Sequence, residues 1–301
     1  MQRLRAVAVS YLNTQPLVQG LDALREVEFA RAVPSRIAPM IRSGEADIGL
    51  ASIVDAVARE PGEKPLALLP CGMIGCAGPT LTVRVFSALP PEQITVLHAD
   101  TDSHASVALA RVVLQDRFGV DAKIVDFDAR ERHPGGDHAP SDAAPGPADP
   151  DEAWPEALLL IGDKVVTDSP PAVRYPHQID LGEAWHGLTG LPFVYAAWMC
   201  DAERAADPSI IAAASVIERQ RRRNAMRLDA IVQQHAPARG WPADLARDYV
   251  ARKLRYALDD DARAGADRFI ARCAELGVLP EGSALRWARS APAAPAHPAG
   301  A

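Results

Sequence analysis

The sequence predicts an α/β protein that is built from two lobes. Apolar runs of strand length alternate with helical patterns in two successive units, and a break at Pro90-Pro91 separates these units. A long helical segment follows, from about residue 207 to residue 287. With 301 residues, the chain is long enough to bury the cores of two lobes.

The first unit begins with a strand at residues 5–9. Thr14 and Pro16 then have the residue types of an N-cap region and a first helical turn, so a helix is expected through Leu24. The pattern continues with a strand at 27–33, a helix from Pro34 to about Gly44, a strand at 46–51 and a strand at 81–87. This alternation is typical of a parallel sheet whose strands are joined by helices.

The second unit repeats the pattern. Strands are predicted at 94–97, 122–127 and 157–163, and Asp102-Ser103 caps a helix after the first of them. Residues 130–155 have almost no apolar side chains, so burial cannot offset their ordering entropy and we expect a disordered surface insertion. The tail is rich in Ala and Pro and is expected to be loose.

Two α/β units, followed by helices that can pack back on the first unit, have the layout of type II periplasmic binding proteins. In this interpretation lobe 1 comprises residues 1–88 and 190–290, and lobe 2 comprises residues 89–189. Residues 291–301 form the loose tail. Lobes of this kind are hinged and bind a small molecule between them.

The composition argues against several classes of binding partner and against a membrane location. The net charge of −7 argues against general binding of nucleic acid or of anionic membranes. The first apolar run is too short for a signal peptide, and no stretch approaches the ~20 apolar residues of a membrane span, so a cytoplasmic protein is expected. The four cysteines form no C-x-x-C pair, and His133 and His138 lie in the polar insertion, so we expect structural thiols and no metal site.

Polar side chains recur where predicted strands end and helices begin. That junction is the edge of a parallel sheet at which ligands bind, and free backbone N–H groups there favour anions. The candidate binding residues are Ser10, Tyr11, Asn13 and Thr14 after the first strand, Ser52 after the third, Thr82 in the strand at 81–87, Thr101, Ser103 and Ser106 around the next helix start, and Gly162 and Asp163 after the strand at 157–163. A single Ser or Thr of this kind is more often a helix cap, but their repetition in both lobes favours a shared, neutral cradle for carboxylates.

Several segments together resemble one enzyme family. They are the stretch V-S-Y-L-N-T-Q-P-L at 9–17, A-D-I-G-L at 46–50, and the segments 78–87, 103–114, 159–163 and 180–198, in this order. As a set they are similar to the chorismate dehydratases of the futalosine route to menaquinone. The resemblance runs from about residue 5 to residue 200.

The resemblance implies a fold, an activity and two site residues. The family has the two-lobed binding-protein fold, uses no cofactor, and is a hydro-lyase that converts chorismate, a dicarboxylate, to 3-[(1-carboxyvinyl)oxy]benzoate. Asn13 corresponds to the family's active-site asparagine and Thr82 to its active-site serine. Arg84 and His104 are two further candidate substrate-binding residues.

The chain departs from the family pattern at three places. Gln15 stands where the family usually has Arg or Lys, Thr82 replaces Ser, and Ser103-His104-Ala105-Ser106 replaces Ser-Arg-Thr-Ser. Loss of two cations and a hydroxyl should weaken binding of a dianion unless Arg84 or His104 compensates.

Three alternatives remain at this point. One is the sibling enzyme that acts on cyclic dehypoxanthinyl futalosine, although its opening motif differs. Another is a non-catalytic binding protein for small acids, which would need a signal peptide or lipobox. The third is a sensory module, which would normally carry a DNA-binding or membrane segment.

Overall fold

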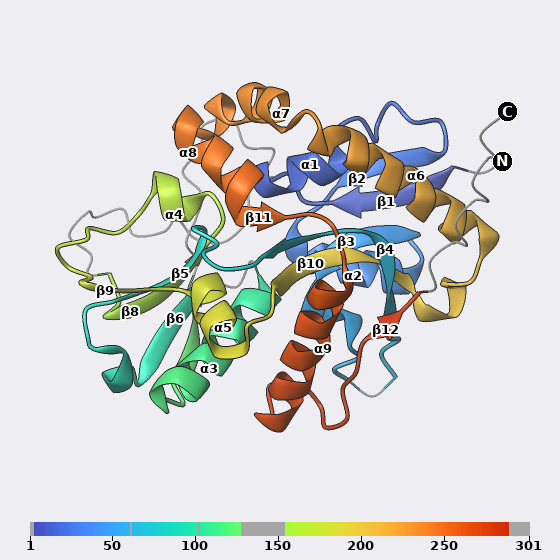
Figure 1. Cartoon of the computed structure of the whole chain (residues 1–301). Coiled ribbons are helices and arrows are strands. Elements are labelled where there is room, and N and C mark those ends of the chain that lie inside the picture. The colour runs from blue at the N-terminus through green and yellow to red at the C-terminus, as the bar shows by residue number, and fades with distance from the viewer. Residues whose placement is uncertain (1–2, 61, 101–102, 128–153, 289–301) are drawn as a thin grey trace, which may run out of the picture.

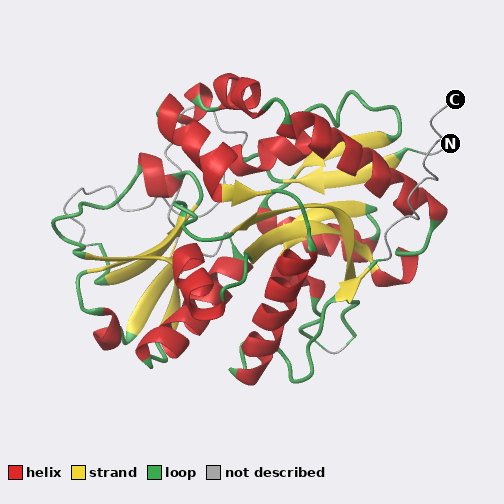
Figure 2. Ribbon diagram, in the orientation of Figure 1, coloured by secondary structure: helices red, strands yellow, loops and turns green. Residues whose placement is uncertain are grey.

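The computed structural model describes residues 3–60, 62–100, 103–127 and 154–288, which form two sheets flanked by helices (Figure 1). The larger sheet has seven strands in the order β11-β4-β10-β3-β1-β2, with β12 also paired to β4. The smaller sheet has five strands in the order β7-β6-β8-β5-β9. Figure 2 shows the two sheets as separate groups of strands. The predicted two-lobed α/β fold is confirmed.

Lobe 1 is built on the seven-stranded sheet. The strands β1 (Leu4–Ala8), β2 (Val27–Arg31) and β3 (Ile48–Ser52) run parallel, with β1 in the middle. The strand β10 (Phe193–Asp201) inserts antiparallel between β3 and β4 (Leu66–Cys76). The short strands β11 (Leu254–Arg255) and β12 (Arg286–Trp287) both pair with β4.

The C-terminal helices cover lobe 1, as predicted. Helix α6 (Pro208–Ala225) packs on β4 and on the short helix α1 (Gln15–Val18), and α9 (Asp260–Glu275) packs on β10. The remaining helices of this lobe are α2 (Pro34–Ser43), α7 (Leu228–His235), α8 (Ala243–Asp248), the π-helical turn η6 (Tyr249–Lys253), and the 3-10 turns η1 (Leu12–Thr14), η2 (Ile53–Ala56), η4 (Ala202–Arg204) and η5 (Pro237–Arg239).

Lobe 2 is built on the five-stranded sheet. Its strands are β5 (Val83–Ser87), β6 (Val96–Asp100), β7 (Lys123–Phe127), β8 (Ala157–Ile161) and β9 (His177–Asp180). Its helices are α3 (His104–Phe118), α4 (Lys164–Thr167), α5 (Leu181–Thr189) and the turn η3 (Pro91–Gln93). The predicted cap of α3 is confirmed, because the side chain of Ser103 accepts a hydrogen bond from the N–H of Ser106. The helix ends at Gly119, whose φ of 69° suits glycine.

Two expectations about lobe 1 were wrong. The helix expected to run through Leu24 ends at Val18, because the chain turns at Gly20 with a φ of 84°, a conformation that glycine adopts without strain. The predicted elements also omit β4, although its buried, almost continuous apolar run is typical of a central strand.

The expected lobe boundary at residue 88 is also wrong. Strand β5 pairs antiparallel with β8 and β9, so it belongs to lobe 2, and the chain crosses between the lobes before Val83. The expected insertion at 130–155 and the tail at 291–301 lie outside the described residues, apart from Trp154 and Pro155. These two residues are packed: the ring of Trp154 lies 6.2 Å from that of Phe127, and the carbonyl of Pro155 accepts a hydrogen bond from the hydroxyl of Tyr175 at 2.6 Å.

Candidate functional site

A cavity of about 100 Å³, here called the interlobe cleft, is lined by residues of both lobes. Lobe 1 contributes residues from the end of β1, from η1, α2, β3, β4, β10, η6 and β11, whereas lobe 2 contributes the start of β5, the end of β8 and the start of α3. The lining residues are Val9, Tyr11, Asn13, Pro34, Ser52, Ile74, Tyr195, Tyr249 and Leu254 from lobe 1, Thr80 from the connection, and Thr82, Val83, Ser103, Ser106, Ile161 and Gly162 from lobe 2. Their polar groups are hydroxyls and one amide.

Tyr249 joins the two residues that the resemblance marks as catalytic. Its hydroxyl lies 2.7 Å from Oγ1 of Thr82 across the lobe boundary. Burial raises the pKa of the Tyr249 phenol, and the nearby Asp163 carboxylate adds to this, whereas hydrogen bonding to Thr82 and Asn13 opposes it. The net effect is a raised pKa, so the phenol of Tyr249 keeps its proton at neutral pH and can either donate or accept a hydrogen bond.

A second tyrosine–threonine pair lies beside the first. The hydroxyl of Tyr195 is 2.6 Å from Oγ1 of Thr80, which is also 3.1 Å from the thiol of Cys76. Burial raises the pKa of Tyr195 well above its usual range and that of Cys76 to about 11, so both groups stay protonated. The cleft therefore offers paired neutral hydroxyls and no thiolate.

The start of α3 forms the third part of the cleft. The hydroxyls of Ser103 and Ser106 are 2.9 Å apart, and both line the cavity. Ser52, at the end of β3 in lobe 1, accepts a hydrogen bond from the N–H of Ala105 at 2.9 Å. A helix N-terminus flanked by serine hydroxyls is suited to bind an anion without a cationic side chain.

The structure brings together part of the predicted set. Tyr11, Asn13, Ser52, Thr82, Ser103, Ser106 and Gly162 line the interlobe cleft, whereas Ser10, Thr14, Arg84, His104 and Asp163 do not line it. Thr101 lies outside the described residues. Thr14 is buried and its hydroxyl donates to Oδ1 of Asn13 at 3.1 Å, so it supports the asparagine instead of capping a helix.

The two residues expected to supply positive charge point elsewhere. Arg84 donates to the side-chain oxygen of Gln178 at 3.0 Å and lies 3.6 Å from the carboxylate of Asp180. His104 lies 2.8 Å from Asp55, and the guanidinium of Arg59 contacts both side chains. Since Asp55 belongs to lobe 1 and His104 to lobe 2, this group connects the lobes.

Gln15 has a structural role in place of the family's cation. Its side-chain amide donates to the carbonyl oxygens of Ser10 at 3.4 Å and of Tyr11 at 3.2 Å, which holds the loop after β1. Arg239 also donates to the carbonyl of Ser10, and its guanidinium is 3.9 Å from the carboxylate of Asp163. Among the described residues, those that line the interlobe cleft carry no charge.

Sequence reasoning missed three lining hydroxyls. Tyr195 lies in the segment 180–198 that carries part of the resemblance, and Thr80 stands two residues before Thr82. Tyr249 lies in the helical segment, where nothing in the pattern separates a cleft residue from a core residue.

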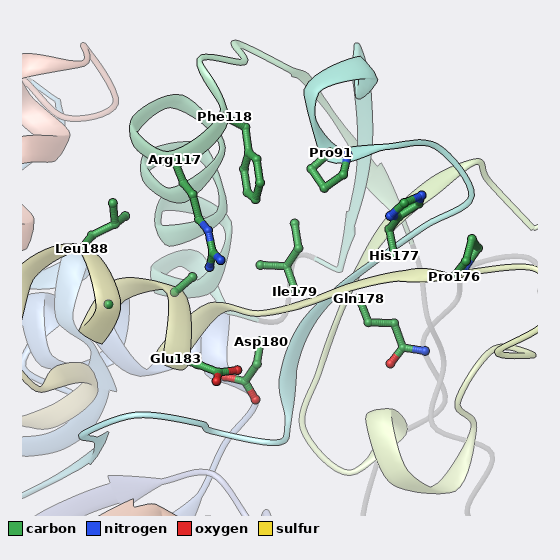
Figure 3. A pocket seen from close by; sticks show the side chains of 12 residues that line it. Pro91, Arg117, Phe118, Pro176, His177, Gln178, Ile179, Asp180, Glu183 and Leu188 are labelled. Atoms are coloured by element: carbon green, nitrogen blue, oxygen red, sulfur yellow. The ribbon is translucent and has the colours of Figure 1, made fainter.

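A larger hollow of about 700 Å³ lies on lobe 2, between the end of α3, β9 and α5 (Figure 3). Its labelled residues include Arg117, His177, Asp180 and Glu183. None of the predicted site residues lines it. The smaller interlobe cleft remains the candidate site, because the polar groups of both lobes converge there.

In the described ranges, no three His, Cys, Asp or Glu side chains are grouped so that they could hold a metal ion. His133 and His138 lie outside these ranges. Cys71, Cys76, Cys200 and Cys273 are buried and free of disulfides. No helix in the described part of the chain is both long and apolar enough to cross a membrane.

Known proteins share this architecture. At 28% identity over 275 residues, the chain is similar to the chorismate dehydratase of Thermus thermophilus, with 86% of this chain and 91% of that protein covered. Its fold is similar to that of the alkanesulfonate-binding protein SsuA from Xanthomonas axonopodis pv. citri bound to MOPS, with a TM-score of 0.62, 13% identity, and coverage of 94% of this chain and 96% of that one. A protein from Archaeoglobus fulgidus gives a TM-score of 0.61 at 11% identity, covering 92% of this chain and 98% of that one.

The two solved structures are too distant in sequence to indicate more than the fold, which is that of periplasmic binding proteins. The family assignment comes from the sequence itself. The family described as menaquinone biosynthesis matches residues 4–275, which include both lobes and most of the C-terminal helices. This chain is therefore a member of the menaquinone biosynthesis family.

Proposed function

We propose that this protein is a hydro-lyase that removes water from chorismate to give 3-[(1-carboxyvinyl)oxy]benzoate, in the futalosine route to menaquinone. The family match and the similarity to a chorismate dehydratase support this activity. The observation that carries it is the group of Thr82, Tyr249 and Asn13, which joins both lobes in the interlobe cleft. In this proposal the substrate is a small dicarboxylate and the reaction takes place in the cytoplasm.

The reaction breaks one C–H bond and one C–O bond on neighbouring ring carbons. The electron pair of the C–H bond enters the ring, the hydroxyl leaves, and the released proton and hydroxide together make water. Aromatisation of the ring supplies the driving force. The protein therefore has to orient the substrate, stabilise the departing oxygen and place a base near the ring hydrogen.

Hydrogen-bond donors in the cleft fit the departing oxygen. Thr82 can donate to the leaving hydroxyl while its own oxygen accepts from Tyr249, whose raised pKa keeps the phenol protonated. The amide of Asn13, which accepts from Thr14, can orient the substrate or donate to an oxyanion. The start of α3, with Ser103 and Ser106, is our candidate for binding a substrate carboxylate, because both hydroxyls line the cleft.

A carboxylate of the substrate itself is our candidate for the base. Among the described residues that line the cleft, none has a carboxylate or an imidazole. Thr82 and Tyr249 keep their protons at neutral pH, because an alcohol is a very weak acid and burial raises the pKa of the phenol. A hydroxyl that keeps its proton is too weak a base to remove the ring hydrogen. Proton transfer to the substrate's own carboxylate needs only that the cleft holds the two groups close together.

Incubation of the purified protein with chorismate tests this proposal. Loss of the diene absorbance together with a product of the mass of 3-[(1-carboxyvinyl)oxy]benzoate is expected. Asn13→Ala should lower kcat by about 10²–10³-fold, the usual effect of losing one oxyanion donor. Thr82→Val should have a similar effect, whereas Thr82→Ser keeps the hydroxyl and should stay within about threefold of wild type.

Other outcomes would identify the alternatives. Tight binding of chorismate without turnover would favour a non-catalytic binding protein for small acids. Turnover of cyclic dehypoxanthinyl futalosine in place of chorismate would favour the sibling enzyme. If Asn13→Ala kept wild-type turnover, the role assigned to Asn13 would be wrong.

A further inference from the structure

One carboxylate holds the segment that carries both cleft threonines. Oδ1 of Asp180 accepts a hydrogen bond from the N–H of Thr80 at 2.9 Å, and Oδ2 accepts one from the N–H of Leu81 at 2.7 Å. Asp180 ends β9 and caps α5, where Oδ1 also accepts from the N–H groups of Gly182 at 3.1 Å and Glu183 at 3.2 Å. Its side chain is only 5% exposed, so water competes little for these bonds.

The backbone at Leu81 needs such support. Its φ is 75°, and within the described ranges Leu81 is the one non-glycine residue in the left-handed region. A leucine in this conformation is strained and persists only where its surroundings hold it. The hydrogen bond from the N–H of Leu81 to Asp180 stabilises this conformation. The turn at Leu81 in turn determines the directions of the neighbouring side chains of Thr80 and Thr82.

The first turn of α5, which Asp180 caps, is in close van der Waals contact with the segment that carries Thr80 and Thr82. A β-carbon on Gly182 would lie 2.6 Å from the sulfur of Cys76 and 2.8 Å from the carbonyl oxygen of Gly78, and closer still to Oγ1 of Thr80. Any side chain at 182 would therefore displace the threonine segment. The stretch Asp180-Leu181-Gly182 thus contacts that segment by hydrogen bonds and by close packing.

Both threonines depend on this arrangement for their partners. With the segment held by Asp180, Thr80 reaches Tyr195 and Thr82 reaches Tyr249, each at normal hydrogen-bond distance. A rotation of the backbone at Leu81 would turn these hydroxyls away from tyrosines that are fixed in lobe 1. An error of about 1 Å in such a group can cost about a hundredfold in rate.

We propose that Asp180 is a positioning residue for the dehydration: it fixes the left-handed turn at Leu81 and so places the hydroxyl of Thr82 against the substrate. This inference rests on the proposed function for its effect on rate. Asp180 acts through the backbone of the threonine segment and does not itself line the cleft.

Asp180→Asn keeps the N-cap role of this side chain but removes the acceptor for Leu81 and the negative charge that lies 3.6 Å from the guanidinium of Arg84. Asparagine is as good an N-cap as aspartate, so its oxygen can keep the bonds to Gly182 and Glu183. Its NH₂ group would then face the N–H of Leu81, which loses its acceptor. We expect kcat to fall at least about tenfold with KM within about threefold, and hydrogen exchange of the peptide 78–84 to accelerate.

The second change, Leu81→Gly, tests whether Asp180 affects kcat through the backbone conformation of residue 81. Glycine adopts a φ of 75° without support, so Leu81→Gly added to Asp180→Asn should restore kcat at least about threefold. A merely structural defect would not recover, because a new glycine adds entropy to the unfolded chain. The matched control is Asp259→Asn, which changes the N-cap of α9 away from the cleft and should leave kcat and the exchange of residues 78–84 unchanged.

If Asp180→Asn does not fold, Leu81→Val tests the same turn without changing Asp180. A β-branched residue tolerates the left-handed region less than leucine does, so kcat should fall while the N-cap of α5 stays intact. Unchanged kcat and exchange in Asp180→Asn, or no rescue by Leu81→Gly, would overturn the positioning role. If the wild-type protein does not convert chorismate, the proposed function fails, and the exchange measurement alone decides whether Asp180 holds the threonine segment.

Discussion

The two lobes contribute different chemistry to the interlobe cleft. Lobe 1 supplies mainly aromatic hydroxyls and an amide, in Tyr11, Asn13, Tyr195 and Tyr249, with one small hydroxyl from Ser52. These residues come from segments far apart in sequence. Lobe 2 supplies the small hydroxyls of Thr82, Ser103 and Ser106, the last two at the start of α3. Lobe 1 therefore contributes mainly phenol hydroxyls and an amide, whereas lobe 2 contributes aliphatic hydroxyls and the start of a helix, which suits a carboxylate.

The lobes also differ in how deeply their ion pairs are buried. In lobe 2, the ammonium of Lys164 lies 2.5 Å from a carboxylate oxygen of Asp100, and both side chains are buried. In lobe 1, Asp47 binds the guanidinium groups of Arg5 at 3.1 Å and Arg204 at 2.6 Å nearer the surface. We therefore expect removal of the partner of Asp100 to destabilise the protein more than removal of one partner of Asp47.

The largest expected effect concerns the buried ion pair. Lys164→Met removes this cation from Asp100 in a low-dielectric setting and should lower the free energy of unfolding by about 3–5 kcal/mol. Denaturant unfolding of the full chain measures it. Lys123→Met, at an exposed lysine of β7, is the control and should change stability by less than about 0.5 kcal/mol. Equal effects of the two variants would remove the contrast between the lobes.

The second effect concerns the tyrosines of lobe 1. Tyr249→Phe removes the hydroxyl that is hydrogen-bonded to Thr82 and should lower kcat for chorismate by about 10²-fold, with a small change in KM. The control is Tyr256→Phe, because the hydroxyl of Tyr256 is buried and has no hydrogen-bond partner among the described residues. That variant should keep kcat. A similar loss in both variants would mean that packing, and not the hydroxyl of Tyr249, is what lobe 1 contributes.

The smallest effect is the response of lobe 1 to acid. Burial by itself would raise the pKa of Asp47, but hydrogen bonds from Arg5 and Arg204 outweigh it and lower the pKa below its usual range. Because the folded pKa lies below the unfolded value of about 3.9, this contribution to stability is present above that pH and is lost as the pH falls through the folded pKa. Both arginines are partly exposed, so the contribution is at most about 1 kcal/mol.

Unfolding free energies measured between pH 5 and pH 2 would show this loss. Asp47→Asn should be less stable than wild type at pH 5, and the difference should shrink toward zero as the pH falls. A difference that stays constant with pH would mean that the charge of Asp47 contributes nothing to lobe 1.

Local patterns predicted most of the fold. The parallel strands β1, β2 and β3 and the capped helix α3 are visible in the sequence because apolar periodicity and cap residues are local signals. The strand β4 was missed because a continuous apolar run lacks alternation, and the insertion of β10 beside it depends on contacts distant in sequence. The assignment of β5 to lobe 2 depends on its partners β8 and β9, which local patterns do not specify.

The site was predicted in part for the same reason. Residues at strand-to-helix junctions, such as Asn13 and Ser103, could be found because the topology of a parallel sheet brings such junctions to one edge. Arg84 and His104 were expected at the ligand because they are cationic, but Asp180 and Asp55 bind them instead. Tyr249 could not be found, since its place in the cleft results from the packing of the C-terminal helices on lobe 1.

The insertion of β10 has a consequence for synthesis of the chain. All strands of lobe 2 come from one continuous stretch, so this sheet can form as soon as residue 180 has left the ribosome. The sheet of lobe 1 has to wait, because its middle strand β10 is made last among its long strands and pairs with β3 and β4 from the first quarter of the chain. Lobe 2 therefore has the topology to fold first, and the edges of β3 and β4 that pair with β10 stay open until β10 is made.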